Sequence, residues 1–333
     1  MLNTRNRNAV NLKILAAALL GLASLACFFT AAGAQAAGPG RLVFVSGKAE
    51  RCRMGACNRF DVIRSVTPHG AGPQRLGLVS SVVETASTEG GTIAVLSKNV
   101  AGGGANSEAY TQVYLVTPDG KRKQVFRERL EGFNATGLGI SGNGKLLAIS
   151  ARFGQREDRR SKIWLVRSDG SGFRQLTTGP GNDEMPALSP DGKRVVFSRT
   201  VGESRRPDLY MAPTSGGGEA LQMTENDLED VNPVISPDGR SVAFGQNNHR
   251  TNRGIVAILR IGQHGPRVVT STGGEYPDPD YSPNGKNLAF VSEILGARGY
   301  DTALYTVSAR GTGRTLVSDA FEYPELPQWT LRP

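Results

Sequence analysis

Residues 188–198 read LSPDGKRVVFS, and three other stretches of the chain repeat this pattern closely. They are ISGNGKLLAIS from Ile140, ISPDGRSVAFG from Ile235 and YSPNGKNLAFV from Tyr281. The second letter is always a serine, at Ser141, Ser189, Ser236 and Ser282, so that successive copies lie 48, 47 and 46 residues apart. A period of roughly 40–50 residues that contains only short strands is typical of a β-propeller, with one blade per period.

The letters Ser-Pro-Asp-Gly predict a tight turn between two strands. Pro fixes φ at the first corner, Asp can bond to its own backbone, and Gly accepts the positive φ that closes the turn. Apolar and β-branched runs stand on both sides, for example at 186–188 and 194–197. A third strand is expected at positions such as 162–167 and a fourth at positions such as 174–177. Four antiparallel strands per repeat would make one blade.

Incomplete copies extend the count at both ends of the chain. Residues 87–97 align with the last full copy, with Ser87 in the place of Ser282, and residues 42–46 match only a second strand. Residues 327–330 match only a first strand, and Thr330 lies 48 residues after Ser282. We therefore expect an all-β fold, a six-bladed β-propeller whose C-terminal strand joins the N-terminal blade and closes the ring. Such closure would protect the sheet edges.

Residues 1–36 have the three parts of a secretory signal peptide. Arg5, Arg7 and Lys13 form a basic start, residues 14–29 are apolar, and Ala34-Gln35-Ala36 is a small-residue cleavage site. We predict cleavage after Ala36, a propeller over residues 37–333 and a periplasmic or secreted protein. A retained membrane anchor is the alternative, but a bilayer-spanning helix needs about 20 apolar residues. No stable membrane insertion is expected after cleavage.

The charge of the chain argues against a nucleic-acid partner and does not identify another partner. The formal net charge is +9, and removal of residues 1–36 takes away three positive charges and leaves +6. The basic residues are spread along the chain without a block of like charges, and export separates the protein from DNA. We expect a soluble monomer that does not bind nucleic acid.

Two cysteines remain after cleavage, Cys52 and Cys57, in the stretch CRMGAC. In an exported protein a disulfide is the expected state of such a pair. Closing so small a loop would add roughly 2 kcal/mol on the chain-entropy account. The alternative, half of a metal site, lacks the second pair of ligands that zinc requires.

The full repeat has a proline three residues before its serine, at Pro186, Pro233 and Pro279. With six units in an exported chain, this pattern resembles the TolB-type propeller family of WD40-like SPDGK repeats, over residues 41–333. The resemblance implies a periplasmic binding propeller. The family's namesake carries an α/β domain ahead of its propeller, and because residues 37–41 leave no room for one, we expect a propeller-only relative. The same repeats also occur in propeller halves of prolyl-oligopeptidase-like enzymes and in some polysaccharide lyases.

The up-and-down order of strands predicts which loops share a face. The Ser-Pro-Asp-Gly turns should all lie on one face, and the longer loops and inter-blade links on the other, where binding is expected. Acidic residues of the links are candidates for a ligand-binding channel mouth: Glu184, Asp230, Asp278 and Glu325. Basic residues of the outer loops are candidates for a rim that contacts a partner: Arg159, Arg160, Arg206, Arg250 and Arg253.

An acidic mouth inside a basic rim would capture a cation or a basic peptide tip, while the rim would contact acidic groups of a partner protein or a glycan. The alternative is that these are ordinary solvated charges of a protein surface. A Ca²⁺ ion at the mouth would need six or more oxygens from a shaped cage, and the carboxylates of separate links need not converge. The sequence therefore predicts no cofactor.

Catalytic signatures are missing from the sequence. There is no Gly-X-Ser-X-Gly elbow, and the three histidines, His69, His249 and His264, occupy unmatched repeat positions. We predict a non-catalytic binding or scaffold propeller for an envelope protein or peptide. The alternative is a carbohydrate- or metal-dependent enzyme of lyase or hydrolase type at the channel mouth. Three or more metal-compatible side chains that meet near the axis would favour the enzyme.

Overall fold

The computed structural model describes the chain from residue 41 to residue 330, and the predicted signal peptide lies outside the described residues. The ranges within these bounds that are not described are 54–55, 67–73, 80–81, 89, 102–107, 118–120, 127–131, 154–159, 203–205, 249, 252, 273–276, 297–298 and 319–324. The described elements are strands, β1 to β24. Within this part of the chain, no helix is both long and apolar enough to cross a bilayer.

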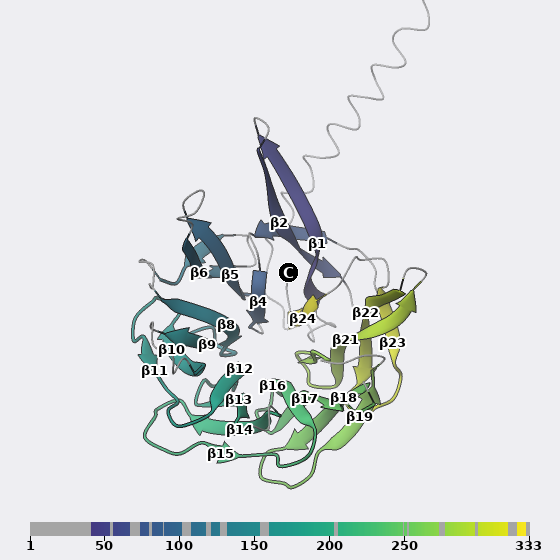
Figure 1. Ribbon diagram of the computed structural model, residues 1–333. Coiled ribbons are helices and arrows are strands. Elements are labelled where there is room, and N and C mark those ends of the chain that lie inside the picture. The colour runs from purple at the N-terminus through teal and green to yellow at the C-terminus, as the bar shows by residue number, and fades with distance from the viewer. Residues whose placement is uncertain are drawn as a thin grey trace, which may run out of the picture. The chain divides into compact units, whose positions relative to one another are not determined.

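The strands form six four-stranded sheets, and five of these are blades of four consecutive strands (Figure 1). The blades are β4 (Val82–Ser87), β5 (Ile93–Ala101), β6 (Glu108–Val116) and β7 (Arg122–Gln124); β8 (Phe133–Ile140), β9 (Leu146–Phe153), β10 (Lys162–Arg167) and β11 (Arg174–Gln175); β12 (Asn182–Leu188), β13 (Arg194–Thr200), β14 (Asp208–Pro213) and β15 (Leu221–Gln222); β16 (Glu229–Ile235), β17 (Ser241–Asn248), β18 (Arg253–Arg260) and β19 (Arg267–Ser271); β20 (Asp280–Tyr281), β21 (Asn287–Gly296), β22 (Gly299–Ser308) and β23 (Thr315–Ser318). All pairs of neighbouring strands are antiparallel. The predicted class, an all-β propeller with four-stranded antiparallel blades, is confirmed.

The remaining sheet combines the two ends of the described chain. Its order is β24 (Glu325–Thr330), β1 (Arg41–Arg53), β2 (Ala56–Val66) and β3 (Gln74–Val79). Strand β24 pairs with β1, with Arg41 opposite Thr330 and Leu42 opposite Trp329, so the predicted pairing of the C-terminal strand is confirmed. The first strands of the five blades contact one another in chain order, and β24 contacts both β20 and β4.

The Ser-Pro-Asp-Gly letters build the turn between the first two strands of a blade. The Ser189 hydroxyl donates to Asp191 Oδ1 over 2.7 Å and accepts from the Arg194 N–H over 2.9 Å. Gly192 has φ 71° and donates its N–H to the Ser189 carbonyl. The same hydroxyl bonds are made by Ser141, Ser236 and Ser282. Serine and aspartate of the repeat therefore hold the turn, and the Ser189 bond lowers the pKa of Asp191.

In the first blade the place of the repeat serine belongs to Thr88, one residue beyond the predicted Ser87. Thr88 accepts the Thr92 N–H on its hydroxyl, and its carbonyl accepts the Gly91 N–H, as Ser189 and Gly192 do. The turn lacks Pro and Asp and is one residue shorter, because Thr88 pairs with Thr92 whereas Ser189 pairs with Arg194. The alignment on Ser87 was therefore wrong by one residue.

The core consists of separate apolar clusters between neighbouring blades. The aromatic residue near the end of the repeat, Phe197, Phe244 or Phe290, is fully buried in each of three such clusters. Burying a side chain of this size contributes about 1.5–3 kcal/mol relative to leaving it exposed. The repeat therefore supplies both the turn and the inter-blade contact.

First strands begin earlier than predicted. Strands β12 and β16 start at Asn182 and Glu229, several residues before Pro186 and Pro233. Each strand shifts its register beside the proline, between Glu184 and Ala187 in β12 and between Val231 and Val234 in β16. A bulge accommodates proline because the ring nitrogen has no N–H for the ladder. Residues expected in inter-blade links therefore belong to strands.

Candidate functional site

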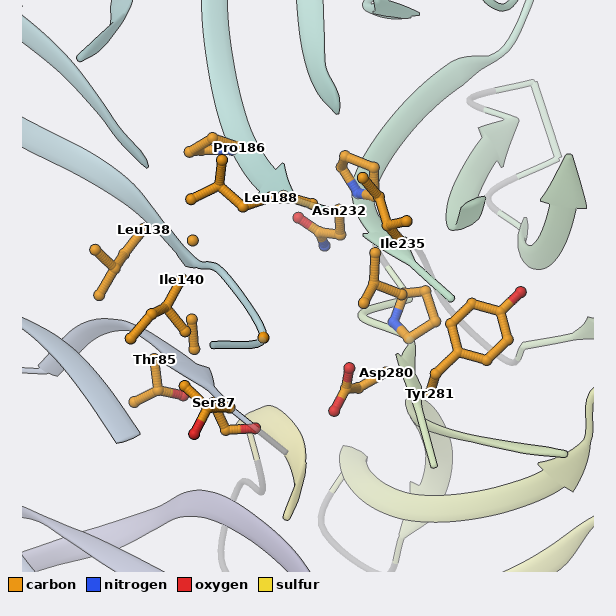
Figure 2. Close-up of a pocket in the computed structure, with 18 of the residues that line it drawn as sticks. Thr85, Ser87, Leu138, Ile140, Pro186, Leu188, Asn232, Ile235, Asp280 and Tyr281 are labelled. Atoms are coloured by element: carbon orange, nitrogen blue, oxygen red, sulfur yellow. The ribbon is translucent and has the colours of Figure 1, made fainter. Parts of the chain in front are cut away.

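The first strands of the blades enclose a cavity of about 150 Å³ (Figure 2). Its apolar lining includes Leu138, Ile140, Leu188, Ile235 and Tyr281, and its polar lining includes Glu84, Thr85, Ser87, Asn232, Asp278 and Asp280. Figure 2 shows Asn232 and Asp280 on one side of the cavity, across from Thr85 and Ser87. Burial raises the pKa of Tyr281, and the Asp238 carboxylate raises it further. The site thus combines apolar walls with several oxygen and amide groups.

One end of the cavity reaches the Ser-Pro-Asp-Gly turns. Gly142, Pro190, Pro237 and Pro283, each next to a turn serine, belong to the lining. We expected binding on the long-loop face, and that expectation stays a prediction, although the lining of this cavity extends to the turns. The first strand is the edge strand of each blade, and the residues after it lead directly into the turn, so the lining includes both.

The lining residues farthest from the turns share one repeat position, four residues before the turn hydroxyl. We call the occupants of this position the ring residues. They are Glu84, Gly137, Met185, Asn232 and Asp278, and all but Gly137 line the cavity. Register shifts accompany the ring residues of the first four blades. Bulges of this kind re-aim side chains and are common next to functional sites.

Two ring residues have backbones in the left-handed region. Met185 has φ 53° and Asn232 has φ 49°, and each precedes a proline, which disfavours compact conformations of the residue before it. A residue with a long side chain, such as methionine, rarely adopts a positive φ, and the backbone strain costs on the order of 1–3 kcal/mol. The Asn232 N–H contacts Met185 Sδ at 3.4 Å, and its side-chain amide donates to the Pro277 carbonyl. The surrounding blades hold both residues in place.

The two acidic ring residues interact across the channel. Glu84 accepts the Thr85 N–H on Oε1 at 3.0 Å. Burial raises the pKa of Glu84 well above its usual range, and the Asp278 carboxylate raises it further. Both effects disfavour a second negative charge in a poorly hydrated site. A cation or a hydrogen-bond donor that entered the cavity would offset both the burial of Glu84 and its repulsion by Asp278.

Asp183 has a different surrounding, although it stands only two residues before the ring residue Met185. It lies fully buried between two blades, where Arg199 binds it with Nε–Oδ1 2.6 Å and Nη2–Oδ2 2.9 Å. Lys162 of the preceding blade approaches the same carboxylate at 3.5 Å and donates to the Gly181 carbonyl. Asp183 therefore joins blades and does not face the cavity.

The structure corrects the placement of Asp230, which we predicted at the channel mouth. It is fully buried six residues before Ser236, at the repeat position of Asp183. Gln246 and Asn226 each donate to its carboxylate at 2.8 Å. Burial raises the pKa of Asp230 to about 6, and the nearby Asp208 carboxylate also raises it. The strand β16 begins at Glu229 and thereby draws Asp230 into the seam between blades.

The other predicted mouth residues have different outcomes. Asp278 lines the cavity, whereas Glu184 lies in β12 outside the lining. Glu325 is the first residue of β24, paired with Val45 in the backbone register. Sequence reasoning missed Glu84 because the first repeat was aligned on Ser87. The spacing from Thr88 to Gly91, which equals that from Ser189 to Gly192, was the signal that could have found it.

The predicted basic rim is present in part. Arg160, Arg250 and Arg253 are exposed, and Arg206 contacts Asp227 at 3.3 Å. Arg159 lies outside the described residues. The rim's role in binding a partner stays a prediction.

Metal-binding groups do not gather in the described ranges, where no three His, Cys, Asp or Glu side chains form a cluster that could hold an ion. His264 is exposed, and His69 and His249 lie outside the described residues. Cys52 and Cys57 face each other in the backbone register of β1 and β2, and the disulfide itself stays a prediction.

The fold is a β-propeller whose first strands line a cavity. Residues 109–331 match the TolB beta propeller domain, and the chain belongs to this family. No curated protein matches the sequence.

Solved structures share the fold at low identity. TolB from Acinetobacter baumannii superposes with a TM-score of 0.67 at 20% identity, over 87% of this chain and 66% of that one. A chain of a nidogen/laminin complex gives 0.59 at 12% identity, over 87% and 98%. An oligogalacturonate lyase from Vibrio parahaemolyticus gives 0.52 at 7% identity, over 84% and 86%. The chain thus spans slightly less than two thirds of the TolB chain.

Proposed function

We propose that this protein is an exported, non-catalytic propeller that binds a basic segment of another cell-envelope protein in its axial channel. The observation that carries the proposal is the pair of carboxylates, Glu84 and Asp278, in a cavity that has apolar walls and further polar groups, among them Asp280. In this proposal the composite sheet with β24 acts as a sixth blade and closes the ring. The predicted signal peptide supports a periplasmic or secreted location.

The cavity favours a side chain or a chain end as its ligand. Its volume of about 150 Å³ is too small for a folded element. Apolar walls formed by Leu138 and Ile235 would contact the stem of a lysine or arginine, because such stems bury readily while the charged head stays with polar partners. The carboxylates would then receive the ammonium or guanidinium group through charge-assisted hydrogen bonds.

The rigidity of the site supports binding. Blades that are packed face to face and strained ring residues hold the cavity in one shape, so that little ordering cost arises when a ligand enters. Membership of the TolB propeller family and the likeness to a chain from a nidogen/laminin complex support a protein partner, since the second structure is a complex of proteins. A glycan is the other partner that the basic rim would accept.

A second candidate function is an enzyme that uses the same channel. A buried carboxyl group with a raised pKa beside a second carboxylate is a common arrangement for general acid catalysis. Glu84 is partly buried, and burial and the Asp278 carboxylate raise its pKa; a lyase is among the proteins that share the fold. The binding reading is preferred because the described residues lack the cluster of three metal-compatible side chains expected for the metal-dependent enzyme.

Site-specific photocrosslinking in cells tests the proposal. A crosslinker at Ser87, in the cavity, should capture a discrete envelope protein, and a crosslinker at Leu221, exposed on the outer strand β15, should not. Capture from Ser87 should disappear when Glu84→Gln and Asp278→Asn are combined. Equal capture from both positions would contradict the proposal, and so would capture from Ser87 that is unchanged in the double variant. Release of sugar fragments from a glycan by the wild type but not by Glu84→Gln would favour the enzyme.

A further inference from the structure

The turns between the first and second strands place a cation at the same repeat position in four consecutive blades. The residue after the turn glycine is Lys145, Lys193, Arg240 or Lys286, and all four side chains are exposed. We call these four residues the turn cations. The turns of neighbouring blades lie against one another, since a Cβ atom added to Gly192 would be 3.4 Å from Ser141 Cβ. The turn cations therefore follow one another along one face of the propeller.

Three arginines bring a second cation from the preceding blade next to a turn cation. In each case the guanidinium donates to a backbone carbonyl at the turn end of the next blade: Arg174 to Thr214, Arg194 to Gly239 over 2.9 Å, and Arg267 to Ala309 over 2.6 Å. Gly239 directly precedes Arg240. Thr214 and Ala309 donate their N–H groups to the carbonyls of Lys193 and Lys286. A carbonyl has no net charge, so these bridging arginines keep theirs.

The turns between the third and fourth strands lie on the same face. Ser168 and Ile261 of these turns donate their N–H groups to the carbonyls of the turn cations Lys145 and Arg240. Exposed basic residues outnumber exposed acids here as well. The basic residues are Arg167, Arg260 and Arg310, and the acids are Asp169 and Glu219.

The acids of the first-to-second-strand turns do not cancel the turn cations. Asp191 and Asp238 each accept a serine hydroxyl and a backbone N–H of their own turn. Asn143 and Asn284 take the place of this aspartate in the turns of Lys145 and Lys286. Among the residues named for this face, which we call the basic face, cations therefore outnumber acids by ten to four.

We propose that the basic face binds the anionic surface of a phospholipid membrane. Hydrogen bonds hold neighbouring turns side by side, so that their cations can meet a flat layer of phosphate groups together. Each Lys or Arg close to an anionic membrane surface adds to binding, and a cluster of them is the sequence feature typical of proteins that recognise anionic lipids. The predicted signal peptide would deliver the protein to a compartment that is bounded by membranes.

An acidic protein is a poorer occupant of the basic face. Stable protein interfaces depend on buried aromatic or apolar anchors. The large apolar side chains that the described residues expose are outside these turns, and they are Phe153, Val201, Leu221, Val268 and Leu316. The contact would therefore be electrostatic and reversible, without insertion of an apolar side chain into the bilayer.

The proposal does not rest on the channel function. The basic face selects anions, whereas the carboxylates of the channel select cations, so that either proposal could fail while the other holds. Glu84→Gln with Asp278→Asn should leave binding to membranes unchanged.

Co-sedimentation of the exported, purified protein with lipid vesicles tests the proposal. The probe is a vesicle of phosphatidylcholine mixed with phosphatidylglycerol, and its comparison is a vesicle of phosphatidylcholine alone. The protein should bind only the mixed vesicle, and binding should weaken as the salt concentration rises. Lys145→Glu with Lys286→Glu should weaken binding at least tenfold, and Lys145→Gln with Lys286→Gln should weaken it less. Because both side chains are exposed, the unfolding midpoint should change little.

The matched control changes the charge of the opposite face by the same amount. Arg250→Glu with Arg253→Glu alters two exposed residues at the end of blade β16–β19 that lies away from the turns, and it should bind the mixed vesicle like the wild type. A fluorescent amino acid supplies an independent readout. At Thr312, which is exposed beside Arg310, nitroxide-labelled headgroups should quench its emission, and at the exposed Val201 they should not.

Several results would overturn the proposal. They are equal binding to the two kinds of vesicle, equal loss of binding in the Lys145/Lys286 and Arg250/Arg253 variants, and quenching that is as strong at Val201 as at Thr312. Binding of a labelled glutamate peptide by a protein that leaves the mixed vesicle unbound would overturn it too, because an acidic protein would then be the occupant.

Discussion

Two sets of carboxylates, only two residues apart in the repeat, have opposite surroundings. Asp183, six residues before its turn serine, is fully buried between blades and bound by Arg199 and Lys162. Asp278, four residues before its serine, lines the axial cavity with Glu84. The comparison teaches that acidic residues at neighbouring repeat positions can lie either in the seam between two blades or against the axial cavity.

The position six residues before the turn serine, which we call the seam position because it lies between two blades, has different surroundings in the two blades that place an aspartate there, at Asp183 and Asp230. In both seams the carboxylate pairs in register with a residue of the second strand, Arg199 for Asp183 and Gln246 for Asp230. The first residue of the preceding third strand is Lys162 in one seam and Asp208 in the other. The Asp183 seam therefore has two cations, whereas the Asp230 seam has an amide and a second acid. Burial and that second acid explain the raised pKa of Asp230.

The largest expected effect is on the Asp183 seam. Asp183→Asn would leave Arg199 and Lys162 buried without their anion, and breaking such a pair costs about 3–5 kcal/mol. We expect a loss of this size in the free energy of unfolding, measured by urea denaturation. The neighbouring Glu184→Gln should change it by less than about 1 kcal/mol. Similar losses in the two variants would remove the distinction between the seam residue Asp183 and its partly exposed neighbour Glu184.

The contribution of Asp230 to the free energy of unfolding should fall as the pH rises. Because the folded-state pKa of about 6 lies above the usual value of 3.8, the folded protein holds this proton more tightly than the unfolded chain. The contribution to stability is present at low pH and is lost as the pH rises from about 4 through about 6. Asp230→Asn should remove this loss and stabilise the protein at pH 7.5 relative to the wild type, by roughly 2–3 kcal/mol.

The measurement is the difference in unfolding free energy between the wild type and Asp230→Asn as a function of pH. Subtraction removes the opposite acid dependence of the turn carboxylates, whose hydrogen bonds to serine lower the pKa of Asp191 and Asp238. If the difference is the same at pH 4 and pH 7.5, the charge of Asp230 is as well compensated by its neighbours as the charge of Asp183 is by Arg199 and Lys162.

A smaller effect is expected at the ring residue Met185. A β-branched side chain tolerates a positive φ poorly, so Met185→Val should destabilise the protein by about 1–2 kcal/mol. Met211→Val, in the regular strand β14, is the matched control and should cost less, since valine suits a strand. Thermal unfolding of the two variants gives the comparison. If Met185→Val proves no worse than Met211→Val, the strain assigned to the ring is absent.

The repeat letters were sufficient for the class of fold because the turn chemistry is local. Ser189, Asp191 and Gly192 make their bonds within one turn, and their spacing in the sequence states the geometry directly. The pairing of the C-terminal strand with β1 could also be predicted, because each fragment lacked what the other supplied.

The site could be predicted only in part. Asp278 was found, but Asp230 was misplaced and Glu84 was missed. The bulge beside Pro233 depends on the register of the two strands, which cannot be predicted from any single residue. A register shift of one residue moves a side chain to the other face of the sheet. The turn at Thr88 has lost its proline and aspartate, so that its repeat position became clear only from backbone hydrogen bonds.

The most direct test of the central claim compares binding and stability in one variant. Glu84→Gln with Asp278→Asn should abolish binding of a labelled lysine-containing peptide to the channel, with at least a tenfold loss measured by isothermal titration calorimetry. It should also leave the protein at pH 7.5 as stable as the wild type or more so, because burial and mutual repulsion that raise the pKa of Glu84 are removed. Undiminished binding, or a loss of stability like that of Asp183→Asn, would show that these carboxylates are structural and would contradict the account.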